Sequence, residues 1–433
     1  MESIETRVLA KVTRRLLPLL IVSYFIAYLD RINIGLAALT MNKDLGFSAT
    51  VFGWGAGIFF LGYFIFEVPS NIALERFGAR RWIFRIMLSW GVMSSAMAFI
   101  SGNASFFLVR FLLGAAEAGF FPGIILYLTY WFPASHRARI VGYFMAAIPV
   151  SSFIGAPVSG YLLGLDGIAG LKGWQWLFIL EGIPAILLSF VVLAYLTDRP
   201  ETAGWLHDEE RAWLVGRLRE ERSHREAIVK FTLGQALGNP RVLLLGLVYF
   251  GIVAANYGFS FWLPQIIKAF GGVSNLETGF ITAIPYAAGT VAMVFWGLRS
   301  DRTRERKWHV AIPILVAAAG LALSALTGDP VLKMTLLTVG GLGIFAVLPC
   351  FWTLPTAFLS GTAAAGGIAL INSIGNLAGF VGPYGMGYIK DATGGFAFGL
   401  LFIAVLAVVS LVTVLALGHD AALESRAATR AAE

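Results

Sequence analysis

The sequence predicts an all-α membrane protein with twelve transmembrane helices in two pseudo-symmetric six-helix bundles. Three observations lead to this prediction: an apolar composition, twelve long apolar segments, and one charged stretch that divides them into two sets of six. Hydrophobic residues make up 58% of the 433 residues and charged residues only 13%, whereas about a quarter of the residues in soluble domains are charged. Such a chain cannot cover its surface with polar side chains, so we expect it to lie in a lipid bilayer.

Twelve segments are long enough to cross a bilayer, which takes about 20 apolar residues in a helix. The first six cover residues 16–39, 51–74, 82–100, 105–131, 140–163 and 176–196. The second six cover residues 242–267, 278–298, 310–326, 332–356, 365–389 and 396–417. Each segment is continuously apolar rather than alternating, and a helix satisfies its backbone hydrogen bonds within one segment. We therefore expect helices rather than a β-barrel.

The distribution of basic residues predicts the orientation. Of the 32 Lys and Arg residues, 25 fall in segments on the same side as the N-terminus and 5 fall on the other side. Because cytoplasmic loops carry the excess of positive charge, we expect a multi-pass protein of the cell inner membrane with both termini in the cytoplasm. Positive charge in short patches between apolar segments is typical of topology signals, so we expect no nucleic-acid partner.

A polar stretch divides the chain into three parts. Residues 198–240 carry 15 charged residues in 43 positions, and residues 208–225 have the apolar spacing of a short amphipathic helix. We predict an N-terminal six-helix bundle at 1–197, a cytoplasmic linker with a short helix at 198–240, and a C-terminal six-helix bundle at 241–433.

A charged motif follows the second span of each half. Glu75-Arg76 precedes Arg80 in the first half, and Asp301-Arg302 lies 226 residues after the first pair. Duplicated halves are typical of secondary transporters, whose substrate site lies at the midplane between them. The motif resembles the signature of the major facilitator superfamily, with a Glu in place of its Asp in the first copy. The resemblance implies that these five residues gate the cytoplasmic side; the alternative is that their charges only set topology.

Four ionisable residues lie inside the predicted spans, where such side chains are costly and usually functional. Asp30 and Arg31 are in the first span, and Arg110 and Glu117 lie seven residues apart on one face of the fourth. An arginine can bind a carboxylate through two parallel hydrogen bonds, and a carboxyl group in a low-dielectric cavity can exchange protons. If these residues gather in one site, they suit the co-transport of an anion and a proton. The alternative is a structural ion pair between the two spans.

Three motifs resemble the anion:cation symporter family of the major facilitator superfamily. They are Tyr28-x-Asp30-Arg31-x-Asn33-x-Gly35, Arg110-Phe-x-x-Gly-x-x-Glu117, and Gly173-Trp-Gln-Trp-x-Phe-x-x-Glu181. The similarity covers nearly the whole chain, and residues 64–81 and 121–139 are most similar to tartrate transporters. The family also includes permeases for hydroxyphenylacetate, phthalate and sugar acids.

The resemblance implies roles for residues of the first half. Arg31 and Arg110 would bind the substrate carboxylate or act as gating residues. Asp30 and Glu117 would be the proton-coupling acids, and Tyr63 would hydrogen-bond the substrate. The two arginines and two acids lie in the motifs above, and Tyr63 matches a position that hydrogen-bonds substrate in sugar-acid members of the family; the alternative for Tyr63 is a contact between helices.

Polar residues of the second half complete the predicted site. Asn372 and Asn376 lie one helical turn apart on the eleventh span and would contact substrate or join helices. The vesicular glutamate branch of the family has an Arg on the seventh span, where this chain has Tyr257, so the second half supplies no fixed positive charge to the site. Glu67 and Glu181, near span ends, are interpreted as structural.

These observations predict a monomeric proton symporter that imports a small organic anion, with a tartrate-like hydroxy-dicarboxylate as the lead substrate. The proton is the coupling ion, and we expect no cofactor, no metal and no enzymatic activity. A membrane enzyme or sensor would need a nucleophile–base pair, a metal cluster or a soluble domain, and the sequence contains no sign of one. Alternatives are an anion exchanger or an importer of aromatic acids. The aromatic residues that would support the latter are Phe25, Phe59, Phe60, Tyr63 and Trp352.

Overall fold

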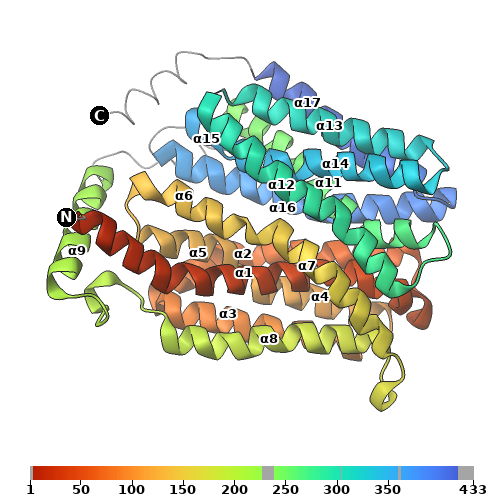
Figure 1. The fold of residues 1–433 in the computed structure, drawn as a ribbon, viewed down its shortest axis with the longest axis horizontal. Coiled ribbons are helices and arrows are strands. Elements are labelled where there is room, and N and C mark those ends of the chain that lie inside the picture. The colour runs from red at the N-terminus through yellow and green to blue at the C-terminus, as the bar shows by residue number, and fades with distance from the viewer. Residues whose placement is uncertain (1–2, 227–237, 304, 359–361, 418–433) are drawn as a thin grey trace.

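The fold is described from a computed structural model. The structure describes residues 3–226, 238–303, 305–358 and 362–417, and this part of the chain is almost entirely helical (Figure 1). The helices form two bundles that lie side by side, with the first half of the chain in one and the second half in the other.

The first bundle contains six membrane-spanning segments. They are α1 (Ile4–Leu45), α2 (Ala49–Phe77), α3 (Ala79–Ala96), α4 (Asn103–Glu117) with α5 (Phe120–Thr129), α6 (Ala134–Met145) with α7 (Ala147–Leu162), and α8 (Gly173–Tyr195). The fourth span is broken between α4 and α5, where Gly119 has a φ of 84°. A Cβ at this position would lie 2.4 Å from the Ser70 hydroxyl, so both the backbone conformation and the close approach require glycine.

The second bundle repeats this arrangement. Its helices are α11 (Pro240–Lys268), α12 (Asn275–Thr303), α13 (Lys307–Leu326), α14 (Pro330–Phe351) with α15 (Thr353–Phe358), α16 (Thr362–Thr393) and α17 (Ala397–Ala416). Eleven segments of the described chain are long and apolar enough to cross a membrane. The remaining span is α16, with 32 residues. The predicted twelve-helix fold is confirmed.

The linker helix α9 (Asp208–Glu226) begins at the predicted residue and lies beside the start of α1 at one end of the molecule (Figure 1). Lys11 of α1 donates a hydrogen bond of 2.7 Å to the carboxylate of Glu210. This hydrogen bond lowers the pKa of Glu210 below its ordinary value, although its burial acts in the opposite direction. Arg137 and Glu221 form a second ion pair at 3.1 Å. The described part of the linker is thus attached to the first bundle.

The two bundles approach each other most closely at the end opposite α9. Cβ atoms at Gly53 and Gly387 would lie 2.5 Å from the Pro383 carbonyl and 2.2 Å from the Ala49 carbonyl, respectively, so α2 and α16 touch through glycines. The carboxylate of Asp391 on α16 accepts hydrogen bonds from the first backbone amides of α2, at 3.1 Å from Ala49 N and 2.7 Å from Thr50 N. This end of the interface is closed.

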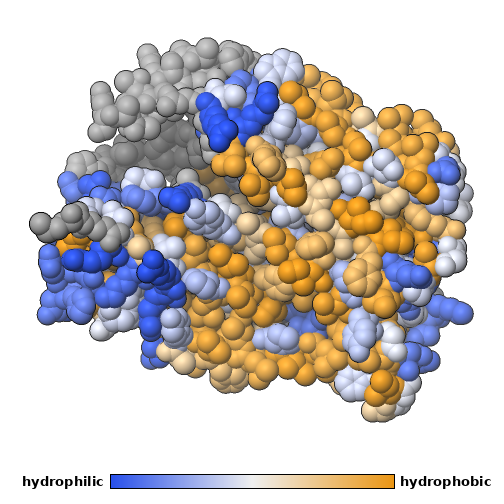
Figure 2. All heavy atoms as spheres, in the orientation of Figure 1, coloured by the Kyte–Doolittle hydropathy of each residue, from blue (hydrophilic) through white to orange (hydrophobic). Residues whose placement is uncertain are grey.

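The surface has the polarity of a membrane protein. Figure 2 shows apolar side chains over the middle of the visible face and hydrophilic side chains gathered around α9, with a smaller polar group at the other end. Large hydrophobic residues are exposed on the outside of both bundles, for example Leu187 at 63% and Phe295 at 70%. Soluble proteins rarely expose continuous apolar surface of this extent, so lipid is the environment that suits it.

Candidate functional site

A central cavity lies between the two bundles, on the α9 side of the glycine contacts. Its volume is about 750 Å³, counted with the space that opens to solvent. The lining is rich in side chains that form hydrogen bonds, and Arg31 is its one charged residue within the described part of the chain. The polar residues of the lining are Tyr24, Tyr28, Arg31, Tyr63, Tyr249, Asn256, Tyr257, Asn372 and Asn376.

Arg31 connects the cavity to both bundles. Its Nη2 donates to a carboxylate oxygen of Glu117 on α4, and its Nη1 donates to the hydroxyl of Tyr257 on α11 at 3.0 Å. The guanidinium also lies 5.3 Å from the ring centre of Phe59 and 5.5 Å from that of Tyr63, within the range of cation–π attraction. Its Nε is buried without a hydrogen-bond partner, so one donor of this side chain is unused.

The break in the fourth span positions Glu117. Glu117 is the last residue of α4, immediately before the turn at Gly119, and is only 1% exposed. A carboxylate at such depth needs a cation or several hydrogen bonds, and Arg31 supplies both the charge and the donor. The predicted proximity of these two residues is present in the structure, while their roles in transport stay predictions.

Arg110 does not line the cavity. It is fully buried, and its Nε and Nη2 donate to the backbone carbonyls of Gly55 and Ala56 on α2, at 3.1 and 3.0 Å. Its guanidinium lies 5.0 Å from the ring centre of Phe59. In this conformation Arg110 is bonded to the α2 backbone, although it lies close enough to Glu117 and Arg31 to interact with both electrostatically. A substrate contact of Arg110 stays a prediction from the sequence.

Asp30 also lies outside the cavity lining. Its carboxylate is 2% exposed and accepts hydrogen bonds from Trp90 Nε1 at 2.8 Å and from the Ser94 hydroxyl at 3.0 Å, both on α3. The neighbouring residue Arg31 faces the cavity, because consecutive side chains of a helix point about 100° apart. The structure thus brings Arg31 and Glu117 together and places Asp30 in the interior of the first bundle.

Tyr63, Asn372 and Asn376 line the cavity, as expected for residues near the substrate. The structure adds Glu67, for which the sequence predicts a structural role. Asn372 Nδ2 donates to Glu67 Oε1 at 2.8 Å, and Asn376 Nδ2 donates to Glu67 Oε2 at 2.9 Å. The sequence signal was present, namely an acid within an apolar span and two amides one turn apart on another span, but nothing in the sequence paired them.

The predicted gating residues lie at the α9 end of the molecule. Glu75, Arg76 and Arg302 are exposed, and the backbone amide of Arg80 donates to Asp198 at 2.7 Å. The side chain of Asp301 lies outside the described residues. None of the four described side chains forms an ion pair with the opposite bundle in this conformation, and their gating role stays a prediction.

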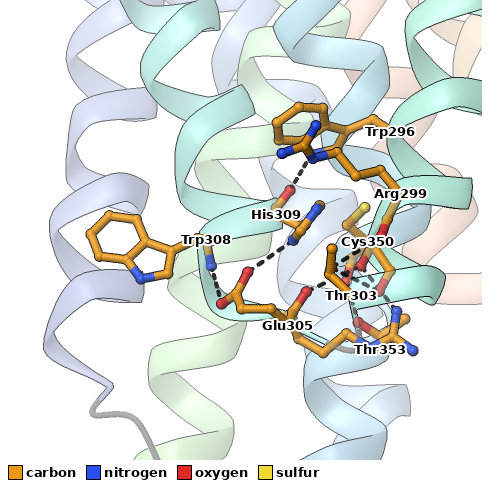
Figure 3. Close-up of polar contacts among 10 residues, drawn as sticks. Trp296, Arg299, Thr303, Glu305, Trp308, His309, Cys350 and Thr353 are labelled. Carbon is orange, nitrogen blue, oxygen red and sulfur yellow. Dashed lines mark hydrogen bonds and ion pairs between the residues drawn. The ribbon is translucent and has the colours of Figure 1, made fainter.

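The loop after Arg302 is held by contacts within the second bundle (Figure 3). The carboxylate of Glu305 accepts from the Trp308 backbone amide at 2.8 Å and contacts His309 Nδ1 at 2.8 Å. Trp296 Nε1 donates to the His309 carbonyl at 2.8 Å. These bonds join the end of α12 to the start of α13.

Comparison with known proteins gives the family. The sequence profile described as "Major Facilitator Superfamily" matches residues 20–383. A "Putative tartrate transporter" of Agrobacterium vitis is 53% identical over 429 residues, covering 99% of this chain and 95% of the relative. A "Quinolone resistance transporter" of Acinetobacter baumannii is 43% identical, with 94% of each chain covered. The "Inner membrane transport protein RhmT" of Escherichia coli K12 is 39% identical, with 91% of each covered.

Solved structures share the fold at low sequence identity. A bacterial homolog of the human lysosomal transporter Spinster superposes with a TM-score of 0.76 at 16% identity, covering 95% of this chain and 97% of that one. The D-xylose-proton symporter gives a TM-score of 0.72 at 16% identity, with 93% and 96% covered. The profile match and the identity over nearly full length together show that this chain belongs to the major facilitator superfamily and is a transporter.

Proposed function

We propose that the protein imports a small organic anion, with a tartrate-like hydroxy-dicarboxylate as the lead substrate, by proton symport with alternating access. The observation that carries this proposal is the ion pair of Arg31 with Glu117 beside the cavity. The relatives named as tartrate transporters support the choice of lead substrate.

The ion pair provides a physical basis for coupling. An ionised Glu117 neutralises Arg31, which then has little attraction for a second carboxylate. A proton on Glu117 removes this competition, and the guanidinium can then bind a substrate carboxylate in the two-bond geometry that arginine favours. The unused Nε–H of Arg31 supplies a further donor. Proton and anion therefore favour each other's binding, and both leave when the proton does.

The polar lining suits a hydroxy acid. Five tyrosine hydroxyls and three asparagine amides surround Arg31, and these groups both donate and accept hydrogen bonds. Hydroxyl groups and a second carboxylate on a small substrate would find partners there. Besides the tyrosines, three aromatic side chains of the lining, Phe60, Phe121 and Trp352, favour the second candidate, an aromatic acid. Competition of labelled tartrate with hydroxyphenylacetate and phthalate separates the two.

The closed end of the interface and the position of the cavity fit one step of alternating access. With both termini in the cytoplasm, the end held by Asp391 faces the periplasm and the cavity lies toward the cytoplasm, so this conformation is inward-facing. In the outward-facing state the charged loops with Glu75 and Arg302 would come together and close the cytoplasmic side. Asp30 would serve as a second proton-coupling acid within the first bundle. We expect the protein to act as a monomer.

Uptake of labelled tartrate into proteoliposomes tests the proposal. An inward proton gradient should accelerate wild-type uptake, and Glu117→Gln should lose this acceleration while still exchanging tartrate for tartrate. Glu201→Gln is the matched control, because Glu201 is exposed in the loop before α9. Tartrate uptake that the gradient leaves unchanged would contradict symport, and wild-type protein without tartrate uptake would contradict the substrate.

A further inference from the structure

Glu67 lies at the boundary between the two bundles and has no part in the Arg31–Glu117 pair. Its side chain is 7% exposed, and each of its carboxylate oxygens accepts one amide N–H, from Asn372 at 2.8 Å and from Asn376 at 2.9 Å. Both asparagines line the cavity. An acid at this depth in a membrane protein is costly to keep and usually functional.

The charge balance of the cavity points to a role for this acid. Arg31 and Arg110 carry two positive charges close to the cavity, and Asp30, Glu67 and Glu117 carry three negative charges when all three acids are ionised. Arg31 and two tyrosines, Tyr63 on α2 and Tyr249 on α11, lie close enough to Glu67 to interact with it electrostatically. A net negative site repels an anion. Anion binding is therefore favoured when Glu67 as well as Glu117 holds a proton.

A proton on Glu67 also changes its contacts with α16. An ionised carboxylate only accepts hydrogen bonds, whereas a protonated one has an O–H donor on one oxygen. The two amide N–H groups fit the ionised form. After protonation, the hydroxyl oxygen is a weaker acceptor and its O–H needs an acceptor of its own, so at least one of the two hydrogen bonds from the asparagines is weakened.

These bonds lie where the two bundles separate. Along α2 and α16, the contacts begin at the closed end with Gly53 beside Pro383 and continue with Gly57 beside Phe380. Among the described residues, the hydrogen bonds of Glu67 are those nearest to α9 that join α2 to α16. A change in these bonds therefore acts directly on the separation of the bundles.

We propose that Glu67 binds and releases a transported proton in each cycle, in addition to the proton on Glu117, and that loss of this proton fastens α16 to α2 in the inward-facing state. The inference rests on the proposed function. It adds an acid that lies on one bundle and is hydrogen-bonded to the other. The proton passes between the carboxyl oxygen of Glu67 and water in the cavity.

The ratio of protons to tartrate, measured in proteoliposomes from the pH gradient at which net tartrate flux reverses at zero membrane potential, tests this inference. Glu67→Gln should lower the ratio by one proton per tartrate. Glu67→Asp, which keeps an acid, and the exposed control Glu201→Gln should keep the wild-type ratio. A folded Glu67→Gln protein with the wild-type ratio would overturn the inference.

Infrared difference spectra of substrate-free protein between neutral and acidic pH give a readout that does not depend on tartrate. The carboxyl C=O band that forms on acidification should lose intensity in Glu67→Gln and move in Glu67→Asp, relative to Glu201→Gln. Wild-type protein that takes up no tartrate would refute the proposed substrate, while these spectra still test Glu67. Identical spectra for Glu67→Gln and Glu201→Gln would overturn the inference itself. If Glu67→Gln does not fold, a carboxyl band at the wild-type position in Glu67→Asp would overturn it.

Discussion

Arg31 and Arg110 both lie deep within the membrane-spanning part of the first bundle, but their guanidinium groups have different kinds of partner. Arg31 is bonded to the carboxylate of Glu117 and the hydroxyl of Tyr257, whereas Arg110 is bonded to two backbone carbonyls of α2. A carboxylate can be neutralised by a proton and replaced by a substrate carboxylate. A backbone carbonyl inside a helix can do neither, so the comparison separates an exchangeable positive charge from a fixed one.

Replacement of Arg31 should have the largest effect on transport. Loss of one partner from a buried, hydrogen-bonded charge pair costs about 2–5 kcal/mol, and every 1.4 kcal/mol corresponds to about a factor of ten. We therefore expect Arg31→Ala to lower tartrate uptake at least about 30-fold at equal expression. Arg31→Lys keeps the charge but loses the planar guanidinium group, so its tartrate uptake should lie between that of wild type and that of Arg31→Ala. A folded Arg31→Ala protein with wild-type uptake would remove Arg31 from the site.

Replacement of Arg110 should act mainly on stability. Arg110→Ala removes both hydrogen bonds from its guanidinium to the carbonyls of Gly55 and Ala56, and a hydrogen bond to a charged group contributes about 1.5–3 kcal/mol. We expect a lower midpoint of thermal unfolding in detergent and a smaller loss of uptake per folded molecule than for Arg31→Ala. An Arg110→Ala protein with unchanged stability and no uptake would instead establish the carboxylate-binding role predicted from the sequence.

Removal of one hydroxyl from the cavity should have a moderate effect. Tyr257→Phe deletes the acceptor of Arg31 Nη1, and a typical hydrogen bond contributes about 0.5–1.5 kcal/mol. Tartrate uptake at low substrate concentration should fall about 2- to 10-fold. Tyr388→Phe is the matched control, because Tyr388 is 59% exposed on the same half of the molecule. Equal uptake by both variants would show that the hydroxyl of Tyr257 does not hold Arg31.

The smallest effect is expected for an ion pair outside the membrane. The pKa of Glu210 is lowered in the folded protein, so its bond to Lys11 stabilises the fold above the ordinary pKa of a glutamate, about 4.3. This stabilisation is lost as the pH falls through the lowered value. Glu210→Gln should therefore be slightly less stable than wild type near neutral pH, and the difference should vanish in acid. Thermal unfolding at several pH values measures it, and a difference that does not depend on pH would contradict the assignment.

The sequence was sufficient to predict the twelve spans, because each needs only a long apolar run. It could not locate the break in the fourth span, since Gly119 is required there by its φ of 84° and by the nearby Ser70. These conditions depend on how α2 packs against the fourth span.

Only part of the site could be predicted, because the contacts between spans depend on how the helices pack. The spacing of Arg31 and Glu117 in two antiparallel spans allowed them to meet, and in the structure they do. The orientation of Arg110 depends on how closely α4 approaches the backbone of α2, which no local pattern records. Glu67 was missed because its partners lie about 300 residues later in the chain, at Asn372 and Asn376 (separations of 305 and 309 positions).

The cap of α2 by Asp391 has a consequence for the speed of the transport cycle. The first two backbone amides of a helix in one bundle depend on a carboxylate from the other bundle. To admit substrate from the far side, the protein must separate them and leave those amides to water. A weaker acceptor at position 391, as in Asp391→Asn, would make this release easier, so one residue far from the cavity would set how often the empty carrier resets.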